Sequence, residues 1–213
     1  MTTSIRSIAT LLVAMCACPL ALAQDNVFKT GVVRYDTHSQ TNGIHGIGVP
    51  PGADAETGDA TTVLFTYERM LRPDLGIELV LGIPPRTETT ATGSVAFLGD
   101  NVLSAKSVSP TLLLNYHFNA PGDTWRPYVG AGINYTHFTG IQSSLAPQVE
   151  MSDSWGWAVQ AGVDYALSKQ WGLWASIAAL KVKSDVVAVG ATVLTTTIDF
   201  RPLTYAFGVS YKF

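Results

Sequence analysis

Large apolar residues alternate with small or polar residues over several long stretches of the chain. Between Ser154 and Leu167, one set of alternate positions holds Trp155, Trp157, Val159, Ala161, Val163, Tyr165 and Leu167. The positions between them hold Gly, Ala, Ser, Gln and Asp. The same alternation recurs over 75–83, 108–118 and 203–213. A period of two is typical of a β-strand with one apolar and one polar face.

Collecting such segments predicts eight strands, over residues 27–37, 61–70, 75–88, 107–118, 125–139, 153–167, 171–184 and 194–213. The predicted connections alternate between long and short. Long ones are expected at 38–60, 89–106, 140–152 and 185–193, and short ones at 71–74, 119–124 and 168–170. An even number of strands with alternating loop lengths is typical of a closed antiparallel membrane barrel. The sequence therefore predicts an all-β fold, an eight-stranded antiparallel transmembrane β-barrel in one domain over 24–213.

A soluble barrel of the lipocalin kind would show the same alternation. Three features favour the membrane. The polar face is mostly Gly, Ala, Ser and Thr, which suits a narrow interior. Aromatic residues gather near strand ends, as in the two interfacial girdles of membrane proteins: Trp155 and Trp157 at the outer side, and Tyr165, Trp171, Tyr211 and Phe213 at the inner side. We also expect Phe213, at the end of an alternating aromatic strand, to act as the signal for the outer-membrane assembly machinery.

The composition supports export into a membrane. Charged residues make up only 14% of the 213 residues, well below the usual quarter. After the N-terminus, no apolar run is long enough for a transmembrane helix. Arg6, the apolar stretch 8–22 and the Ala21-Leu22-Ala23 site predict a signal peptide over 1–23. Both cysteines, Cys16 and Cys18, lie within it, so we expect a mature chain without thiols.

Charged residues on the polar face are expected inside the barrel. The residues concerned are Glu68, Glu78, Arg126, Asp164 and Lys212, with Arg34 and Asp36 added on a less certain register of the first strand. A charge in a narrow lumen must be paired or hydrated. Mutual pairing that plugs the periplasmic half is therefore the preferred interpretation. A polar floor that blocks straight passage is also compatible with this pattern.

No nucleophile, phosphate-binding or metalloprotease motif appears in the expected mature chain. The four histidines lack metal-ligand spacing. Ser152, Asp153 and Ser154 near the predicted outer rim, with His137 on the preceding strand, could form a lipid-modifying site. Loop capping is the simpler interpretation. We therefore expect no enzyme activity, no cofactor, no metal and no nucleic-acid partner.

The run Trp125–Phe138, W-R-P-Y-V-G-A-G-I-N-Y-T-H-F, closely resembles the OmpW family of outer-membrane proteins. Further matches are Ser152–Gly156, Gln160–Tyr165, Leu75–Leu79, Ser109–Leu112 and the closing Tyr-Lys-Phe. The resemblance implies an eight-stranded barrel in the bacterial outer membrane, surrounded by its lipid. It also implies a lumen that passes small hydrophobic molecules, as in the alkane-uptake relative AlkL.

The resemblance also suggests where a constriction would lie. Val80 on the third strand would face Ala178 on the seventh, where the family can place a bulky Trp. Trp174, on the same face of the seventh strand, is expected to compensate. The loop at 46–52, G-I-G-V-P-P-G, departs from the family in carrying few large apolar residues.

Proline placement suggests an exit from the lumen. Proline lacks the backbone N–H that a central strand donates. Pro84 and Pro85 lie toward the outer end of the third predicted strand, and Pro110 at the outer start of the fourth. These prolines either mark a lateral opening or merely end the strands. With the resemblance, they favour passive uptake with lateral release into the membrane. The alternative is a structural barrel whose loops bind a partner without transport.

Overall fold

Eight antiparallel strands close into a barrel in the computed structural model, which describes residues 26–190 and 193–213. They are β1 (Asn26–Thr37), β5 (Ala60–Arg72), β6 (Leu75–Gly82), β9 (Thr111–His117), β10 (Trp125–Ser143), β12 (Ser154–Ala166), β13 (Trp171–Leu180) and β16 (Pro202–Lys212). Each pairs with the next along the chain, and β16 returns to pair with β1. The predicted eight-stranded meander is confirmed. The predicted signal peptide lies outside the described residues.

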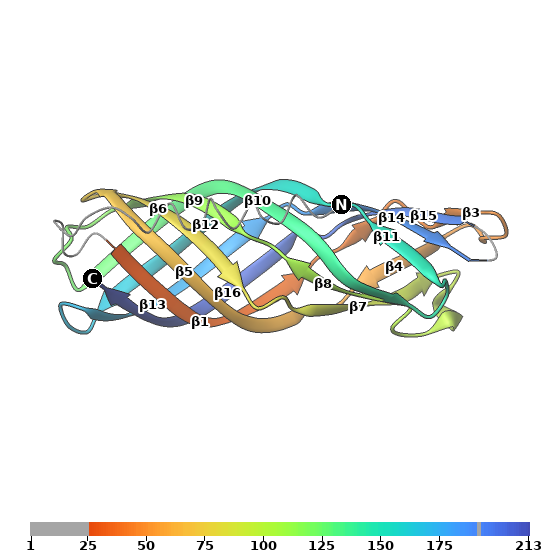
Figure 1. Cartoon of the computed structure of the whole chain (residues 1–213), viewed down its shortest axis with the longest axis horizontal. Coiled ribbons are helices and arrows are strands. Elements are labelled where there is room, and N and C mark those ends of the chain that lie inside the picture. The colour runs from red at the N-terminus through yellow and green to blue at the C-terminus, as the bar shows by residue number, and fades with distance from the viewer. Residues whose placement is uncertain (1–25, 191–192) are drawn as a thin grey trace, which may run out of the picture.

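The barrel continues into a second tier of strands that lengthens it at one end, on the right in Figure 1. One wall combines β4 (Ala53–Thr57), β7 (Arg86–Gly93) and β8 (Leu103–Val108) with the upper part of β10. The other combines β11 (Gln148–Met151), β14 (Lys183–Val189) and β15 (Val193–Asp199) with the short β2 (Gln40–Thr41) and β3 (His45–Gly46). A 3-10 turn, η2 (Ala96–Leu98), follows β7.

The second tier corrects the prediction of four long connections. All four segments contain paired strand residues. β4 and β7 contain no large apolar side chain that would have revealed them as strands; β7, for example, reads R-T-E-T-T-A-T-G. Threonine favours strands through its branched β-carbon, yet a Thr-rich strand shows no apolar alternation. The predicted third, fourth, seventh and eighth strands are each divided in two, by breaks at 83–85, 109–110, 181–182 and 200–201.

Large apolar side chains cover the outside of the barrel. Phe207 and Trp155, for example, are 66% and 73% exposed. The other outward residues of this kind include Phe28, Val32, Phe65, Leu112, Leu114, Val129, Ile133, Trp157, Val159, Leu173 and Val209. Water-soluble monomers rarely expose an apolar surface of this extent. The inward positions hold small and polar residues together with a few large ones that line the lumen, such as Leu64, Leu113 and Trp174. The predicted assignment of faces is confirmed on β9, β12 and β16, and the apolar band is the lipid-facing surface.

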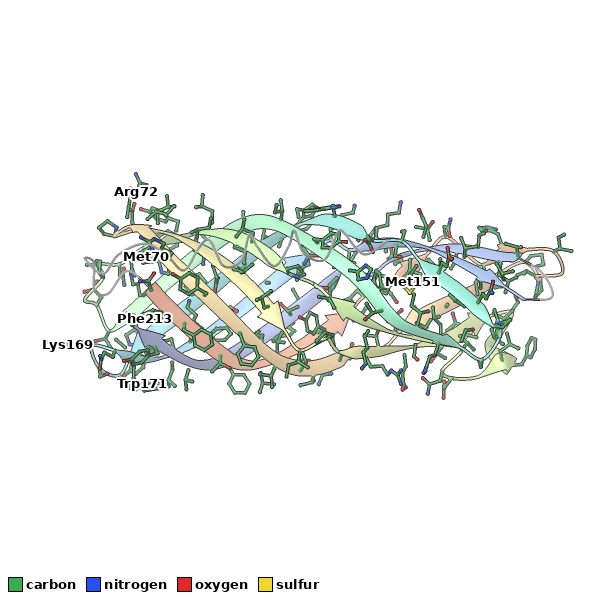
Figure 2. The ribbon with its side chains drawn as sticks, in the orientation of Figure 1. Met70, Arg72, Met151, Lys169, Trp171 and Phe213 are labelled. Atoms are coloured by element: carbon green, nitrogen blue, oxygen red, sulfur yellow. The ribbon has the colours of Figure 1, made fainter. Side chains whose placement is uncertain are left out.

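Aromatic pairs mark both ends of that band. Tyr135 packs against Trp155 at the end that carries the second tier, with ring centroids 4.8 Å apart. At the end with the short turns, Trp125 packs on Tyr165 and Trp171 on Tyr211. Figure 2 shows Trp171 and Phe213 together at this end. In outer-membrane barrels the short turns face the periplasm, so the two-tiered end is the outer one. Across 26–190 and 193–213, no helix could cross a bilayer.

Candidate functional site: a lumen with a polar floor

A buried ion-pair cluster crosses the lumen near the periplasmic turns. The Lys29 ammonium lies 3.2 Å from a Glu68 carboxylate oxygen and 3.1 Å from one of Asp164. His117 lies 2.8 Å from the other Glu68 oxygen. The ammonium also lies 4.6 Å from the centre of the Tyr128 ring, within cation–π range. Four strands, β1, β5, β9 and β12, are thereby tied together across the barrel axis.

A layer of hydrogen bonds continues this floor. The Asn115 amide donates to Glu68 at 2.9 Å and to Glu78 at 2.8 Å. Gln160 also donates to Glu78, at 2.7 Å, and so does the Thr66 hydroxyl, at 2.7 Å. A buried carboxylate is stable only when it is paired and hydrogen-bonded in this way. We refer to the six residues Lys29, Glu68, Glu78, Asn115, His117 and Asp164 as the floor.

The predicted lumen charges therefore divide into two groups. Glu68, Glu78 and Asp164 belong to the floor. Arg126 instead donates to the backbone carbonyls of Pro73 and Asn119 at the turn end, and Lys212 lies opposite Val27 where β16 pairs with β1. Lys29, the cation that neutralises two of the carboxylates, was missed in the sequence analysis.

The register of the first strand was the cause of that omission. Arg34 and Asp36 were placed inside, but both lie on the outward face of β1, and the Arg34 guanidinium, with its side chain 64% exposed, pairs with Asp59 at 3.0 Å. The inward residues are instead Lys29, Val33 and their neighbours two positions along. The adjacent valines, Val32 and Val33, give both faces an apolar residue, so alternation alone could not fix the register.

The floor also gathers three groups that can bind metals. Ligand atoms of Glu68, His117 and Asp164 lie within 4.8 Å of one another. The Lys29 ammonium already lies against both carboxylates. It supplies the positive charge that a metal ion would otherwise supply, so this cluster is best described as an ion-pair network.

A cavity of about 120 Å³ occupies the lumen above the floor. Its lining is mostly apolar or small and includes the three predicted constriction residues, Val80, Trp174 and Ala178. Glu78 is the only charged side chain among its lining residues in the part of the chain that the structure describes. The cavity therefore has an apolar wall and a polar base.

Trp174 narrows this cavity from the side where the first and last strands meet. Its indole N–H lies 3.4 Å from the Thr30 carbonyl and 3.2 Å from that of Val209. Gly208 of β16 lies opposite Trp174 of β13 on one side and opposite Gly31 of β1 on the other. Two inward-facing glycines side by side leave the space that the indole occupies, so the bulky residue in this lumen lies below the level of Ala178.

The strand ladder is interrupted at the prolines. β6 pairs with β9 as far as Val80 opposite Thr111, and β7 resumes with β8 at Arg86 opposite Lys106. Five residues, 81–85, thus lie on one side of the interruption and four, 107–110, on the other. Pro84 and Pro85 fall on the first side and Pro110 on the second, and the Ser107 N–H donates to the Pro85 carbonyl at the outer edge.

The cavity reaches this interruption from inside. Its lining includes residues from both sides, namely Leu81, Gly82, Pro85, Ser107 and Ser109. The opposite edges of the same strands remain paired: Gly82 with Leu64 of β5, and Val108 with His137 of β10. The loss of pairing is therefore confined to one seam of the wall.

An apolar ceiling closes the cavity toward the second tier. Phe138 and Phe200 stack with ring centroids 5.6 Å apart and cluster with Val182, Val186, Ile198 and Ala105. Above them lies a second, apolar cavity of about 80 Å³ between the two outer walls, lined by residues such as Ile44, Val102 and Leu194. Two apolar chambers thus lie in series, separated by an aromatic pair.

Comparison with known proteins agrees with this architecture. The family model described as OmpW family matches residues 24–213. The chain belongs to the OmpW family. Among its relatives, outer membrane protein W of Vibrio cholerae is 31% identical over 162 residues, which cover 72% of this chain and 74% of that protein. The dibenzothiophene metabolism operon protein PahQ of Pseudomonas aeruginosa is 28% identical over 136 residues, 63% of each chain.

A solved structure from the same comparison supports the fold. The crystal structure of the outer membrane protein OprG from Pseudomonas aeruginosa superposes with a TM-score of 0.81 at 26% identity, and covers 90% of this chain and 96% of that one. This OmpW-family chain is therefore an outer-membrane β-barrel in contact with membrane lipid.

The suspected rim site of this OmpW-family barrel is held by hydrogen bonds. Asp153 accepts from the Tyr135 hydroxyl and lies against His137 Nδ1, both at 2.6 Å. The two serines bind backbone instead: Ser154 accepts from the Lys183 N–H and Ser152 from that of Asp185, each at 2.8 Å. The histidine and acid are brought together, whereas the two hydroxyls bind β14, from the start of β12 in Ser154 and from the link between β11 and β12 in Ser152.

Proposed function

We propose that this barrel takes up small, uncharged, apolar molecules passively through the outer membrane and releases them sideways into the bilayer. The proposal rests on one observation: an apolar cavity ends on a polar floor and opens toward a seam in the wall, between 81–85 and 107–110, where the strands are not paired. Each solute would enter from the outer chamber, pass the aromatic pair and reach a base that it cannot cross.

The floor makes a lateral exit the favourable route. Straight passage would require an apolar solute to displace the ion pairs that join Lys29 to Glu68 and Asp164 and then to enter water. Transfer of apolar surface into water costs about 25 cal/mol per Å², whereas the bilayer lies just outside the seam. The prolines leave this seam with fewer ladder hydrogen bonds to break.

A relative supports the class of solute. The name of PahQ associates it with dibenzothiophene metabolism, and dibenzothiophene is a small, uncharged, apolar molecule of the kind that the cavity lining would accept. The family resemblance found in the sequence implies the same class. No step of this transport requires bond chemistry, so we infer that the protein is not an enzyme.

Blocking the lumen tests the proposal. Cells that produce the chain would be given an apolar dye that fluoresces on entering lipid, and the rate of the fluorescence rise would be measured. Ala178→Trp should fill the cavity and slow dye entry severalfold, whereas Ala179→Trp on the outward face should not. The amount of folded barrel is measured by its heat-modifiable migration, the change in gel mobility between unboiled and boiled samples. Equal dye-entry rates for the wild type and Ala178→Trp, at equal amounts of folded barrel, would favour a structural barrel without transport.

A further inference from the structure

Two cations face each other on the outside of the barrel, just above the lipid-facing band. Arg86 of β7 and Lys106 of β8 are register partners, and both side chains are exposed. Their neighbours Thr87 and Ala105 point inward, which fixes Arg86 and Lys106 on the outer face. Like charges directly opposite each other destabilise an antiparallel pair, so this arrangement needs a compensating anion.

The protein supplies little compensation itself. Arg86 donates to the Gln142 side-chain oxygen at 3.0 Å. Neither cation forms a salt bridge with any residue that the structure describes. Glu88 is the next outward residue on β7, farther from the membrane. Asp153, on the same side of the barrel, is already engaged by Tyr135 and His137.

Two other cations of the outer rim are paired with carboxylates. Arg34 pairs with Asp59 at 3.0 Å, and Arg201 with Asp199 at 3.0 Å. Hydrogen bonds from the Thr37 backbone N–H and from Arg34 lower the pKa of the Asp59 carboxyl, which keeps it anionic. Lys181 and Lys183 are also exposed and form no salt bridge with the residues that the structure describes. What distinguishes Arg86 and Lys106 is that they lie directly opposite each other on paired strands.

The height of the pair matches a lipid headgroup. Val108, the outward residue below Lys106, is 38% exposed on the lipid face and lies opposite His137. Tyr135, one outward step lower on β10, packs on Trp155 in the outer aromatic girdle. Lys106 lies opposite Thr139, four residues beyond Tyr135, which is about 13 Å along the tilted strand. This places Lys106 above the girdle, at the level of the lipid headgroups.

We propose that Arg86, Lys106 and the side-chain amide of Gln142 bind a phosphate group of an outer-leaflet lipid headgroup. Arginine presents a planar set of donors that matches phosphate oxygens, and lysine adds a point charge. The Gln142 oxygen orients the guanidinium, and its amide nitrogen adds a further donor. A lipid bound here would lie against the wall beside the interrupted seam, because the pairing of β7 with β8 starts at Arg86 and Lys106, where that seam ends.

The test measures lipid binding to the full barrel in zwitterionic detergent. Lipid A, a phosphorylated glucosamine lipid, is added in increasing amounts, and its adducts are detected by native mass spectrometry. Each cation near an anionic headgroup contributes about fivefold in affinity. R86Q/K106Q should therefore weaken the tightest lipid A adduct by about tenfold or more. Lys169→Gln, which removes one positive charge at the opposite end of the barrel (Figure 2), should leave it unchanged.

Two further arms make the result decisive. Each variant is first shown to be folded by its heat-modifiable migration. A lipid A derivative without phosphate should bind the wild type and R86Q/K106Q equally and weakly. Equal lipid A affinity of the wild type and the folded double variant would overturn the proposal. If inorganic phosphate alone bound the wild type as tightly as lipid A does, the proposal that the bound phosphate belongs to a lipid would be overturned.

Discussion

Lys29 is the residue on which the closed floor most depends. Its ammonium is fully buried and touches two carboxylates that arrive from different strands. Breaking a buried ion pair by removing one partner typically costs about 3–5 kcal/mol, because the other charge is left uncompensated. One side chain on β1 therefore compensates two buried carboxylates.

Lys29→Met should lower the free energy of unfolding by about 3–5 kcal/mol. The measurement is urea unfolding in detergent or lipid, with barrel content followed by heat-modifiable migration. The matched control is Lys169→Met, an exposed lysine in a turn, which should change little. Adding Glu68→Gln to Lys29→Met should recover part of the loss, since it removes an unpaired anion. Unchanged stability of Lys29→Met would contradict the role of the floor.

The position of a single residue could be predicted where its strand alternates clearly between apolar and polar residues. Glu78, Asp164 and Trp174 lie on strands with a clear apolar face, and their inward placement was predicted. Lys29 was missed and Arg34 misplaced because Val32 and Val33 obscure the register of β1. The hydrogen bonds of Asn115 and Gln160 to Glu78 join β6, β9 and β12; sequence spacing alone cannot bring them together.

Each barrel strand has one face toward the lipid and one toward the lumen. On β16, Phe207 points to lipid and its neighbour Gly208 to the lumen against Gly31. The eight barrel strands could be predicted because lipid demands an unbroken apolar face. The outer strands could be predicted only where they continue these eight, as β15 does. β4 and most of β7 are bounded by water on the outside and hold no large apolar residue, so they show no apolar alternation.

A charge on the lipid face of β16 tests this division. Phe207→Arg should destabilise the barrel by about 2–4 kcal/mol, the usual effect of arginine near the bilayer midplane. Phe207→Leu, which keeps an apolar side chain at the same site, should have a much smaller effect. Both are compared by unfolding in lipid vesicles. Wild-type stability of Phe207→Arg would reverse the assignment of the faces.

The whole barrel closes by pairing its last strand with its first, and that strand ends beside the inner girdle. Phe213 packs on Tyr211, whose ring contacts Trp171. We propose that this terminal aromatic is also read during assembly. Deleting Phe213 should reduce the amount of inserted barrel in the outer membrane and leave precursor or fragments in the periplasm. Fractionation followed by blotting measures this, and normal surface amounts would count against it.

At the scale of the molecule, the central claim is that apolar solutes leave through the seam between β6 and β9. The most direct measurement is dye uptake by a Gly82→Cys, Ser109→Cys variant. If the ladder continued beyond Val80 opposite Thr111, these two lumen-lining residues would form its next inward-facing pair, after Leu81 opposite Pro110. A β-carbon at Gly82 would meet only the Val63 carbonyl, at 3.5 Å, so the substitution fits the space.

Oxidation of this pair should slow the entry of an apolar dye, and reduction should restore it. The control places cysteines at Ser176 and Ala206, which are already paired and also line the lumen; its oxidation should leave the rate unchanged. Mass spectrometry verifies each disulfide, and the expected mature chain adds no thiol of its own. Unchanged uptake with the Gly82–Ser109 disulfide fully formed would contradict lateral release.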